Sequence, residues 1–247
     1  MNIAILSDQH FPCNGADTEV LVNTAAALGA AGADVSLVVP DLPRRTAEDV
    51  MAYYGVPATF ELVAVPGWPW PERTFRIEKL THGVISAFRG AARRADVVHT
   101  RNLLPLIGAH LQRARWSFET YRRFAEEKPW LPSVLRHLEL SRGIGAVVHS
   151  EAARTDMIRL GLAPHAVVLA KPGVSLARYT PRIDRAEARR RCRLPPQGPL
   201  VAYVGNIQLF KGMTDLLEVA RRIPAARFVV VGGSPAEVEV LRAEATR

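Results

Sequence analysis

The sequence predicts an α/β protein in which parallel strands alternate with crossover helices. Residues 2–7 and 34–39 form short apolar runs, and the segment 17–31 between them has apolar residues at helical spacing. The order of strand and helix returns in 200–247, which holds two further strand–helix units. Such alternation indicates a parallel sheet whose strands are joined by helices that cover its faces.

The chain divides into a large first part and a small second part. We expect a Rossmann-like domain over 1–174, a linker rich in arginine and proline over 175–199, and part of a second Rossmann-like domain over 200–247. A doubly wound domain normally carries five or six strands, so the two expected after residue 199 make an incomplete one.

Composition is that of a globular protein. The 247 residues are 48% apolar and 23% charged, and this length is enough for a sizeable core. No apolar run approaches the roughly 20 residues of a membrane span. The N-terminus runs directly into the first strand without a basic region, so no signal peptide is expected and the predicted location is the cytoplasm.

The net charge of +8 raises the question of an anionic partner. Only four of the 32 basic residues are lysines, a bias that GC-rich coding also produces, and six arginines cluster within 182–193. A basic face can contact nucleic acid or anionic lipid, but it is more often a solvated helix face. We expect no nucleic-acid partner and keep peripheral contact with the inner membrane face as an alternative.

Two features of the sequence exclude common sites. The loop 8–16 after the first strand contains one glycine, Gly15, and no Gly-x-Gly-x-x-Gly pattern, which disfavours a dinucleotide site. Cys13 and Cys192 form no disulfide framework and have no metal-ligand spacing. No metal site is therefore expected.

The middle of the chain continues the alternation. Gly32 ends the first helix, and Thr46 and Ser150 are candidate N-caps. The expected strands are 60–65, 96–101, 115–121, 144–149 and 166–169, and the expected helices are 46–54, 73–94, 104–112, 133–142 and 150–161. In the helix 73–94, the inward-facing residues are expected to be Ile77, Leu80, Val84, Ile85, Phe88 and Ala91. The segment 66–71 has three prolines and two tryptophans, so we expect a packed loop or one that grips a sugar or lipid.

Polar residues lie where strands of the first domain end. Ligands of open α/β sheets bind beyond the carboxyl ends of the strands. His10 lies in the loop after the first strand, and His99 and Arg101 end another. We expect His99 and Arg101 to point to opposite sides, so that only one of them faces a ligand.

A possible phosphate site lies in the second part. The apolar run 200–204 predicts a buried strand, the loop 205–212 holds Lys211, and 213–222 has helical spacing. Free N–H groups at the helix start, together with a lysine, suit a phosphate, although an ordinary strand–helix turn has the same features.

These segments resemble the retaining GT-B nucleotide-sugar glycosyltransferases of the family 4 type. Tyr203-Val-Gly-Asn-Ile-Gln-Leu-Phe-Lys-Gly212 is similar to their donor-phosphate segment, with Asn206 where the family has arginine. Asp96-Val-Val-His99 is similar to a family strand motif, and Gly15-Ala16 to a Gly-Gly pair.

The resemblance implies a GT-B-like fold and transfer, with retention, of a sugar from a nucleotide-sugar donor to a sugar, lipid or small-molecule acceptor. The nucleotide-sugar is a co-substrate, and no further cofactor is implied. Glu119 stands where relatives have a cleft histidine or glutamate, which implies a catalytic or acceptor-side role. The donor-binding residues implied are Gly15, Gly205, Asn206, Lys211 and Gly212, and the acceptor-side residues are His10, His99 and Arg101.

Two other functions stay open. The departures at Ala16, Asn206, Pro172 and Ser175 would suit an inactive acceptor- or lipid-binding module that needs a partner chain. A nucleotide-sugar epimerase would share the same fold.

Overall fold

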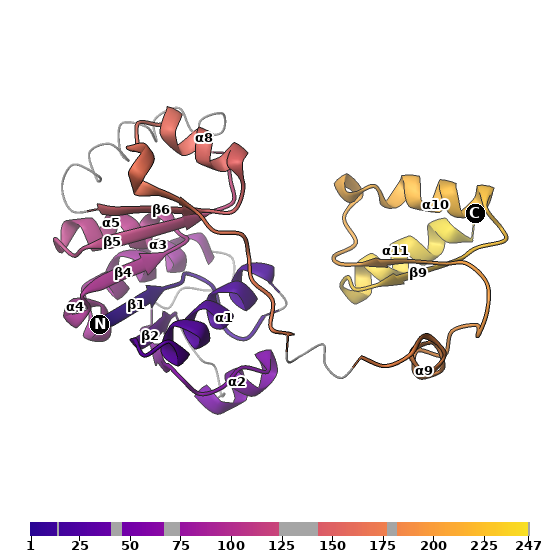
Figure 1. The fold of residues 1–247 in the computed structure, drawn as a ribbon, viewed down its shortest axis with the longest axis horizontal. Coiled ribbons are helices and arrows are strands. Elements are labelled where there is room, and N and C mark those ends of the chain that lie inside the picture. Colours follow the sequence, from indigo (N-terminus) through magenta and orange to yellow (C-terminus); the bar gives the residue numbers. More distant parts are fainter. Residues whose placement is uncertain (14, 41–45, 67–74, 124–142, 177–181, 247) are drawn as a thin grey trace. The chain divides into compact units, whose positions relative to one another are not determined.

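The computed structural model forms two compact units, residues 1–174 and 175–247 (Figure 1). It describes all residues except 14, 41–45, 67–74, 124–142, 177–181 and 247. The predicted helix 133–142 and most of the proline–tryptophan segment 66–71 therefore lie outside the described residues.

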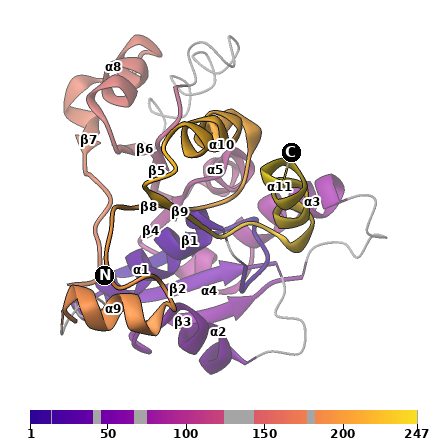
Figure 2. The same cartoon turned by 90° about the vertical axis from the view of Figure 1, so that its right-hand side faces the viewer.

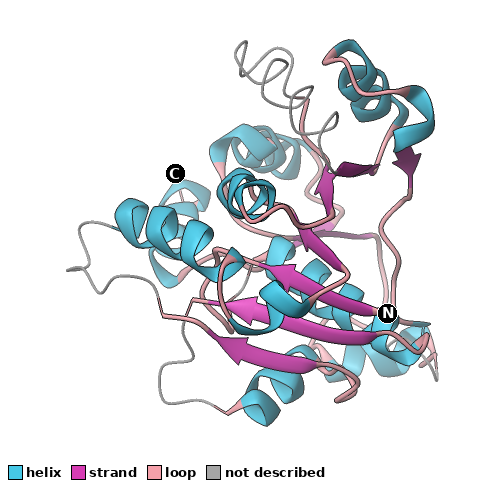
Figure 3. Cartoon of the chain, turned by 90° about the vertical axis from the view of Figure 1, so that its left-hand side faces the viewer, coloured by secondary structure: helices cyan, strands magenta, loops and turns pink. Residues whose placement is uncertain are grey.

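The first unit is built on one parallel sheet in the order β3-β2-β1-β4-β5-β6-β7 (Figure 3). Each predicted strand is present within one or two residues of its expected ends. The strands are β1 (Asn2–Leu6), β2 (Asp34–Val39), β3 (Glu61–Ala64), β4 (Val97–Thr100), β5 (Trp116–Thr120), β6 (Gly143–Val148) and β7 (Val167–Leu169).

The sheet reverses its winding direction beside β1. The chain proceeds from β1 through β2 to β3 on one side and then continues from β4 to β7 on the other. Leu6 pairs with Val38 of β2 and with Thr100 of β4, so these three strands end together. The loops after β1 and β4 therefore leave the sheet at its topological switch point, where open α/β sheets bind ligands.

Helices cover the sheet where the sequence has apolar periodicity. In the described part of the first unit they are α1 (Ala16–Ala30), α2 (Ala47–Tyr54), α3 (Phe75–Ala87), α4 (Gly90–Arg94), α5 (Leu103–Leu111) and α8 (Glu151–Arg159), with a 3-10 turn at Pro164–Ala166. The predicted caps are confirmed: Thr46 accepts a hydrogen bond from the Asp49 N–H, and Ser150 accepts one from the Ala153 N–H.

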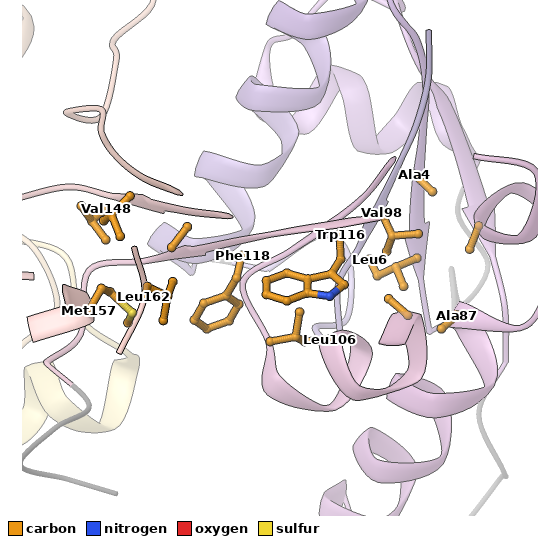
Figure 4. Close-up of a cluster of buried hydrophobic side chains, with 14 of the residues drawn as sticks. Ala4, Leu6, Ala87, Val98, Leu106, Trp116, Phe118, Val148, Met157 and Leu162 are labelled. Atoms are coloured by element: carbon orange, nitrogen blue, oxygen red, sulfur yellow. The ribbon is translucent and has the colours of Figure 1, made fainter. Parts of the chain in front are cut away.

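Alternating residues of the strands supply two separate cores. Ile3 and Ile5 pack with Leu21 and Val22 of α1, whereas Ala4 and Leu6 belong to a second cluster on the opposite face. That second cluster continues through Trp116 and Phe118 of β5, which Figure 4 shows beside Leu106 of α5.

The predicted helix 73–94 is wrong as a single element. It is divided into α3 and α4, and the break near Gly90 (φ +50°) changes which side chains face inward. Phe88 is 42% exposed rather than buried, and Ala92 is buried in place of Ala91.

The second unit contains a two-stranded parallel sheet of β8 and β9 (Figure 2). Its elements are α9 (Arg185–Arg191), β8 (Leu200–Val204), a 3-10 turn at Leu209–Lys211, α10 (Met213–Arg222), β9 (Arg227–Val231) and α11 (Pro235–Ala245). Residues 200–204 form the predicted strand, but the prediction that this strand is buried is wrong, because Val204 is 77% exposed.

The segment predicted as a linker, 175–199, contains regular structure. It includes α9, capped by Asp184, and it belongs to the second unit. Arg189 of α9 is buried and donates hydrogen bonds to the carbonyl oxygens of Pro195 (3.1 Å) and Gly198 (2.7 Å). These bonds fold the chain back onto the helix, which local composition did not indicate.

Candidate functional site

Polar side chains gather at the carboxyl ends of β4, β5 and β6 in the first unit. They occupy the alternate positions of strands whose other side chains build the core: Val98, Phe118 and Val148 are in the hydrophobic cluster. Their neighbours His99 and Glu119, and His149 directly after β6, therefore lie on the opposite face.

Glu119 is the centre of this cluster and is only 5% exposed. Its Oε2 lies 3.1 Å from Nε2 of His99, and its Oε1 lies 2.7 Å from Nε2 of His149. Nε of Arg101 lies 3.7 Å from the same Oε1. The expectation that His99 and Arg101 point to opposite sides is wrong, because residues two apart at a strand end share a face.

The surroundings of Glu119 keep its carboxyl group ionised. Burial by itself would raise the pKa, but the hydrogen bonds with His99 and His149 and the positive charge of Arg101 outweigh it and lower the pKa to about 2. Glu119 is therefore a carboxylate, able only to accept hydrogen bonds, throughout the physiological pH range.

Further contacts fix the basic members of the cluster. Nδ1 of His99 lies 2.8 Å from Oγ of Ser117, so both ring nitrogens of His99 have partners. Nη2 of Arg101 lies 3.3 Å from a carboxylate oxygen of Asp17, and its guanidinium carbon lies 5.7 Å from the centre of the Tyr121 ring. The side chains of Arg101 and Glu119 are each 7% exposed, so this pair is held away from solvent.

A pocket of about 330 Å³ lies beside this cluster, all of it within the first unit. Its walls come from the start of α1 and from the residues that follow β1, β4, β5, β6 and β7. The lining residues are Gln9, Cys13, Gly15, Ala16, Asp17, Thr18, Val20, Arg101, Tyr121, His149 and Pro172. The pocket therefore spans the carboxyl edge of the sheet.

The loop after β1 is fixed by α2. The hydroxyl group of Tyr54 accepts a hydrogen bond from the Cys13 N–H and donates one to the Cys13 carbonyl, both at 3.0 Å. Gly15 is the N-cap of α1, the described residues make no side-chain cap hydrogen bond there, and Gly15 to Thr18 at this helix start line the pocket. His10 is half-buried in the same loop and does not line this pocket.

The four donor residues predicted in the second unit lie in one loop and at one helix start. The Tyr203 hydroxyl donates to the Asn206 carbonyl (2.8 Å), and Lys211 is exposed on the 3-10 turn. Gly212 is the N-cap of α10 at φ +76°, a left-handed conformation that favours glycine. A side chain at Gly232 would meet the Gly205 carbonyl, so the turn after β9 packs closely on this loop.

The described residues contain neither a metal-ligand cluster nor a membrane-spanning helix. No group of three or more His, Cys, Asp or Glu side chains in that part of the chain is arranged to hold a metal ion. No helix there has the length and apolarity needed to cross a membrane.

The sequence matches a known protein family. The model of Glycosyltransferase Family 4 matches residues 18–178, which is more than half of the sequence. The chain belongs to Glycosyltransferase Family 4. The predicted membership is thereby confirmed. The matched region includes Glu119 and the three basic residues around it, His99, Arg101 and His149.

Among curated relatives, the chain is similar to D-inositol 3-phosphate glycosyltransferases of mycobacteria. It is 28% identical over 173 residues to that of Mycobacterium sp. strain KMS, a match that covers 60% of this chain and 39% of the relative. The figures for the Mycobacterium leprae strain TN protein are 28% identity, 60% and 40%. The match thus covers about two fifths of the length of these relatives.

Solved structures confirm the predicted α/β, GT-B-like fold class. Anabaena HepE, in complex with UDP and glucose, has a TM-score of 0.68 at 15% identity; the match covers 100% of this chain and 66% of that chain. The UDP-GlcNAc 2-epimerase of Neisseria meningitidis, bound to UDP-GlcNAc, has a TM-score of 0.67 at 12% identity, covering 99% and 69%. At such identities the likeness concerns the fold alone.

The sequence predicted only part of the site of this family 4 chain. The predicted residues His99, Arg101 and Glu119 lie together in the structure, and Gly15 lines the adjacent pocket. The residues that it missed are Asp17, Ser117, Tyr121 and His149. His149 carried a detectable signal, because it is the last residue of the predicted strand 144–149, as Arg101 is of the predicted strand 96–101.

Proposed function

We propose that the chain transfers a sugar from a nucleotide-sugar donor to an acceptor hydroxyl group that binds in the first unit. The observation that carries this proposal is the pocket of about 330 Å³ at the carboxyl edge of a family 4 domain. It lies beside the topological switch point of the sheet, and Arg101, Glu119 and His149 meet there.

The pocket surface is mostly apolar, and a few hydrogen-bonding side chains at its walls can orient an acceptor. Asp17, Arg101, Tyr121 and His149 offer hydrogen-bond donors and acceptors, and Val20 and Pro172 add apolar surface. The similar mycobacterial proteins are D-inositol 3-phosphate glycosyltransferases, so a polyol that carries a phosphate is the first acceptor to test.

The donor diphosphate is assigned to the second unit. The uncapped start of α10 at Gly212 offers backbone N–H groups, and Lys211 next to it offers a positive charge. These groups would stabilise the negative charge of the departing diphosphate, which is the main electrostatic task in glycosyl transfer. UDP-sugars are the first donors to test, since HepE is seen with UDP and glucose. Retention of configuration is part of this proposal, and the family resemblance supports it.

The experiment incubates the purified chain with UDP-glucose, UDP-galactose or UDP-GlcNAc, with and without D-inositol 3-phosphate. We expect acceptor-dependent release of UDP and a product whose mass is that of the acceptor plus one sugar. Binding of a UDP-sugar without any turnover would support the binding-module alternative, and conversion of the sugar without an acceptor would support the epimerase alternative.

A cytoplasmic location at the inner membrane face is part of the same proposal. Arg89, Arg93 and Arg94 are exposed at α4 and would face anionic headgroups. Sedimentation with phosphatidylglycerol vesicles tests this contact; equal sedimentation with neutral vesicles, or none with either, would contradict it.

A further inference from the structure

A second hollow lies at the amino ends of the strands in the first unit, at the opposite edge of the sheet from the Glu119 cluster. Its volume is about 660 Å³. Its walls come from the residue after α3, from α4, and from the segments that lead into β4 and β5. The polar and aromatic side chains that line it are Phe88, Arg93, Asp96, Gln112, Arg113 and Arg115. The sugar transfer proposed above does not use this edge.

Basic side chains outnumber acidic ones in this hollow. Three arginines line it together with one carboxylate, that of Asp96. Oδ2 of Asp96 accepts a hydrogen bond from the Asn2 N–H at 2.7 Å, where α4 lies against β1 beside the N-terminus (Figure 1). In the part of the chain that the structure describes, the guanidinium groups of Arg93 and Arg115 have neither an ion pair nor a hydrogen bond. The hollow therefore has a surplus of positive charge.

Hydrogen-bond donors are in surplus as well. Each guanidinium group carries five N–H donors and no acceptor. Gln112, in the same wall, has a buried Nε2 for which the described residues offer no acceptor. An oxygen-rich anion supplies what these groups lack, namely negative charge and several acceptors.

The arginines are not needed to cap the helix that ends here. Arg113 follows α5 in a left-handed conformation (φ +62°). Its N–H donates to the His110 carbonyl at 2.9 Å, and the Ala114 N–H donates to the Ala109 carbonyl at 3.0 Å. This backbone pattern satisfies the last carbonyls of a helix by itself. A helix C-terminus also carries only about half a negative charge, which is less than one guanidinium group.

The chemistry of the walls favours a phosphoryl group. The planar guanidinium fork matches the oxygens of a phosphate in pairs, and arginine is enriched wherever that geometry is recognised. Phe88 is 42% exposed at the same hollow and offers an apolar surface to the organic part of a ligand. The volume lies within the roughly 300–1,000 Å³ that small-molecule sites occupy.

We propose that this hollow binds a phosphoryl group, carried either by a small phosphate ester or by the headgroup of an anionic lipid. Arg93, Arg113 and Arg115 bind its oxygens, and Phe88 contacts the organic part. This inference goes beyond the transfer reaction and does not rest on it, because the hollow and the Glu119 cluster lie at opposite edges of the sheet.

The chain supplies a matched control for Arg113. Arg193 follows α9 in the same way, at φ +54°, and its N–H donates to the Arg190 carbonyl at 3.1 Å. It is exposed and belongs to the second unit. Glycine is favoured in this conformation, so Arg113→Gly and Arg193→Gly each remove one charge without straining the backbone. Neither should lower the melting temperature, so a loss of binding would not reflect unfolding.

The first test titrates the full ¹⁵N-labelled chain with inorganic phosphate and with sn-glycerol 3-phosphate at constant ionic strength. Backbone amide signals of 93–96 and 112–115 should shift. Arg113→Gly and Arg115→Gln should each weaken binding about tenfold, since each removes a charge-assisted contact. Arg193→Gly should leave the affinity within twofold, and so should Arg94→Gln, at an exposed arginine of α4 that does not line the hollow.

The second test separates the two sources of the phosphoryl group. Sedimentation of the chain with phosphatidylglycerol vesicles is compared with sedimentation with phosphatidylcholine vesicles. Binding to the anionic vesicles alone, lost in Arg113→Gly and kept in Arg193→Gly, together with no binding of the soluble probes, would support a lipid headgroup. Binding of a soluble probe with the same dependence would support a small phosphate ester.

Two results would overturn the inference. One is that neither the soluble probes nor the anionic vesicles bind. The other is an equal loss of binding in Arg113→Gly and Arg193→Gly, which would show that net charge alone attracts the probe. Neither test measures UDP release, so failure of this inference and failure of the proposed function are distinguishable.

Discussion

The strands of the two sheets differ in how charged side chains are placed at their carboxyl ends. In the first unit, Glu119 and Arg101 are almost completely buried and joined to two histidines. In the second unit, Lys211 is exposed, and it stands beside a helix start without a side-chain cap. The first edge is organised before any ligand arrives, and the second presents charge and N–H groups for a ligand to organise.

Strand number explains the difference. Seven strands with helices on both faces remove the ends of β4 and β5 from water, so a charge there is stable only with partners. Two strands cannot do this: Val204 and Val231, which close β8 and β9, are 77% and 52% exposed. A charged group at the carboxyl ends of these two strands therefore needs no network.

The largest expected effect comes from removing the centre of the network. Glu119→Ala leaves Arg101 with its Asp17 contact but without its buried partner, and such a loss costs about 3–5 kcal/mol of unfolding free energy. Urea unfolding followed by circular dichroism measures it. Glu151→Ala, which removes an exposed glutamate 3.9 Å from Arg154, is the control and should cost less than about 1 kcal/mol. Equal losses would contradict the contrast between buried and exposed charge.

Acid should weaken the first unit through the same residue. Because the pKa of Glu119 is about 2 in the folded chain against an ordinary 4.5, its stabilisation is fully present above pH 4.5 and is lost as the pH falls toward 2. A gap of this size corresponds to about 3 kcal/mol. Unfolding free energies measured from pH 6 to pH 2 should fall more steeply for the unsubstituted chain than for Glu119→Gln. Identical slopes would show that Glu119 titrates normally.

In the second unit, charge removal should affect binding and not stability. Lys211→Ala should weaken UDP binding about tenfold by calorimetry, and the melting temperature should stay within about 1 °C, since the side chain is exposed. Arg227→Ala removes an equal charge at the amino end of β9 and should change neither quantity. A stability loss with unaltered UDP binding would make Lys211 structural.

The elements of both units could be predicted because their signals are local. Short apolar runs predicted strands such as β1, β2 and β9, and the Thr46 and Ser150 caps marked two helix starts. The break between α3 and α4 could not be predicted, since Phe88 and Ala91 continue the helical spacing across it. Burial in β8 was overestimated, because an apolar run does not reveal how many neighbouring strands cover it.

The candidate site was predictable in part for a related reason. Polar residues at strand ends were visible in the sequence, so His99, Arg101 and Glu119 were selected. Their joint contact depends on the strand order β4-β5-β6, which a sequence pattern does not specify. Ser117 contacts His99 on the neighbouring strand β4, and His149 contacts Glu119 on the neighbouring strand β5. Neither contact can be inferred without knowing that order.

The smallest expected effect tests whether the two units unfold independently. Each unit has one helix with a matched capping box: Thr46 with Asp49 at α2, and Ser234 with Glu237 at α11. Replacing the cap by alanine removes one hydrogen bond to the helix start and costs about 1 kcal/mol. Because residues 1–174 and 175–247 form two compact units, Thr46→Ala should lower only the unfolding transition reported by Trp116, in the core of the first unit. Ser234→Ala should lower only a transition reported by amide exchange in β8 and β9. A shift of both transitions by either substitution would mean that the two units unfold as one. The buried and the exposed carboxyl edges would then belong to a single cooperative structure.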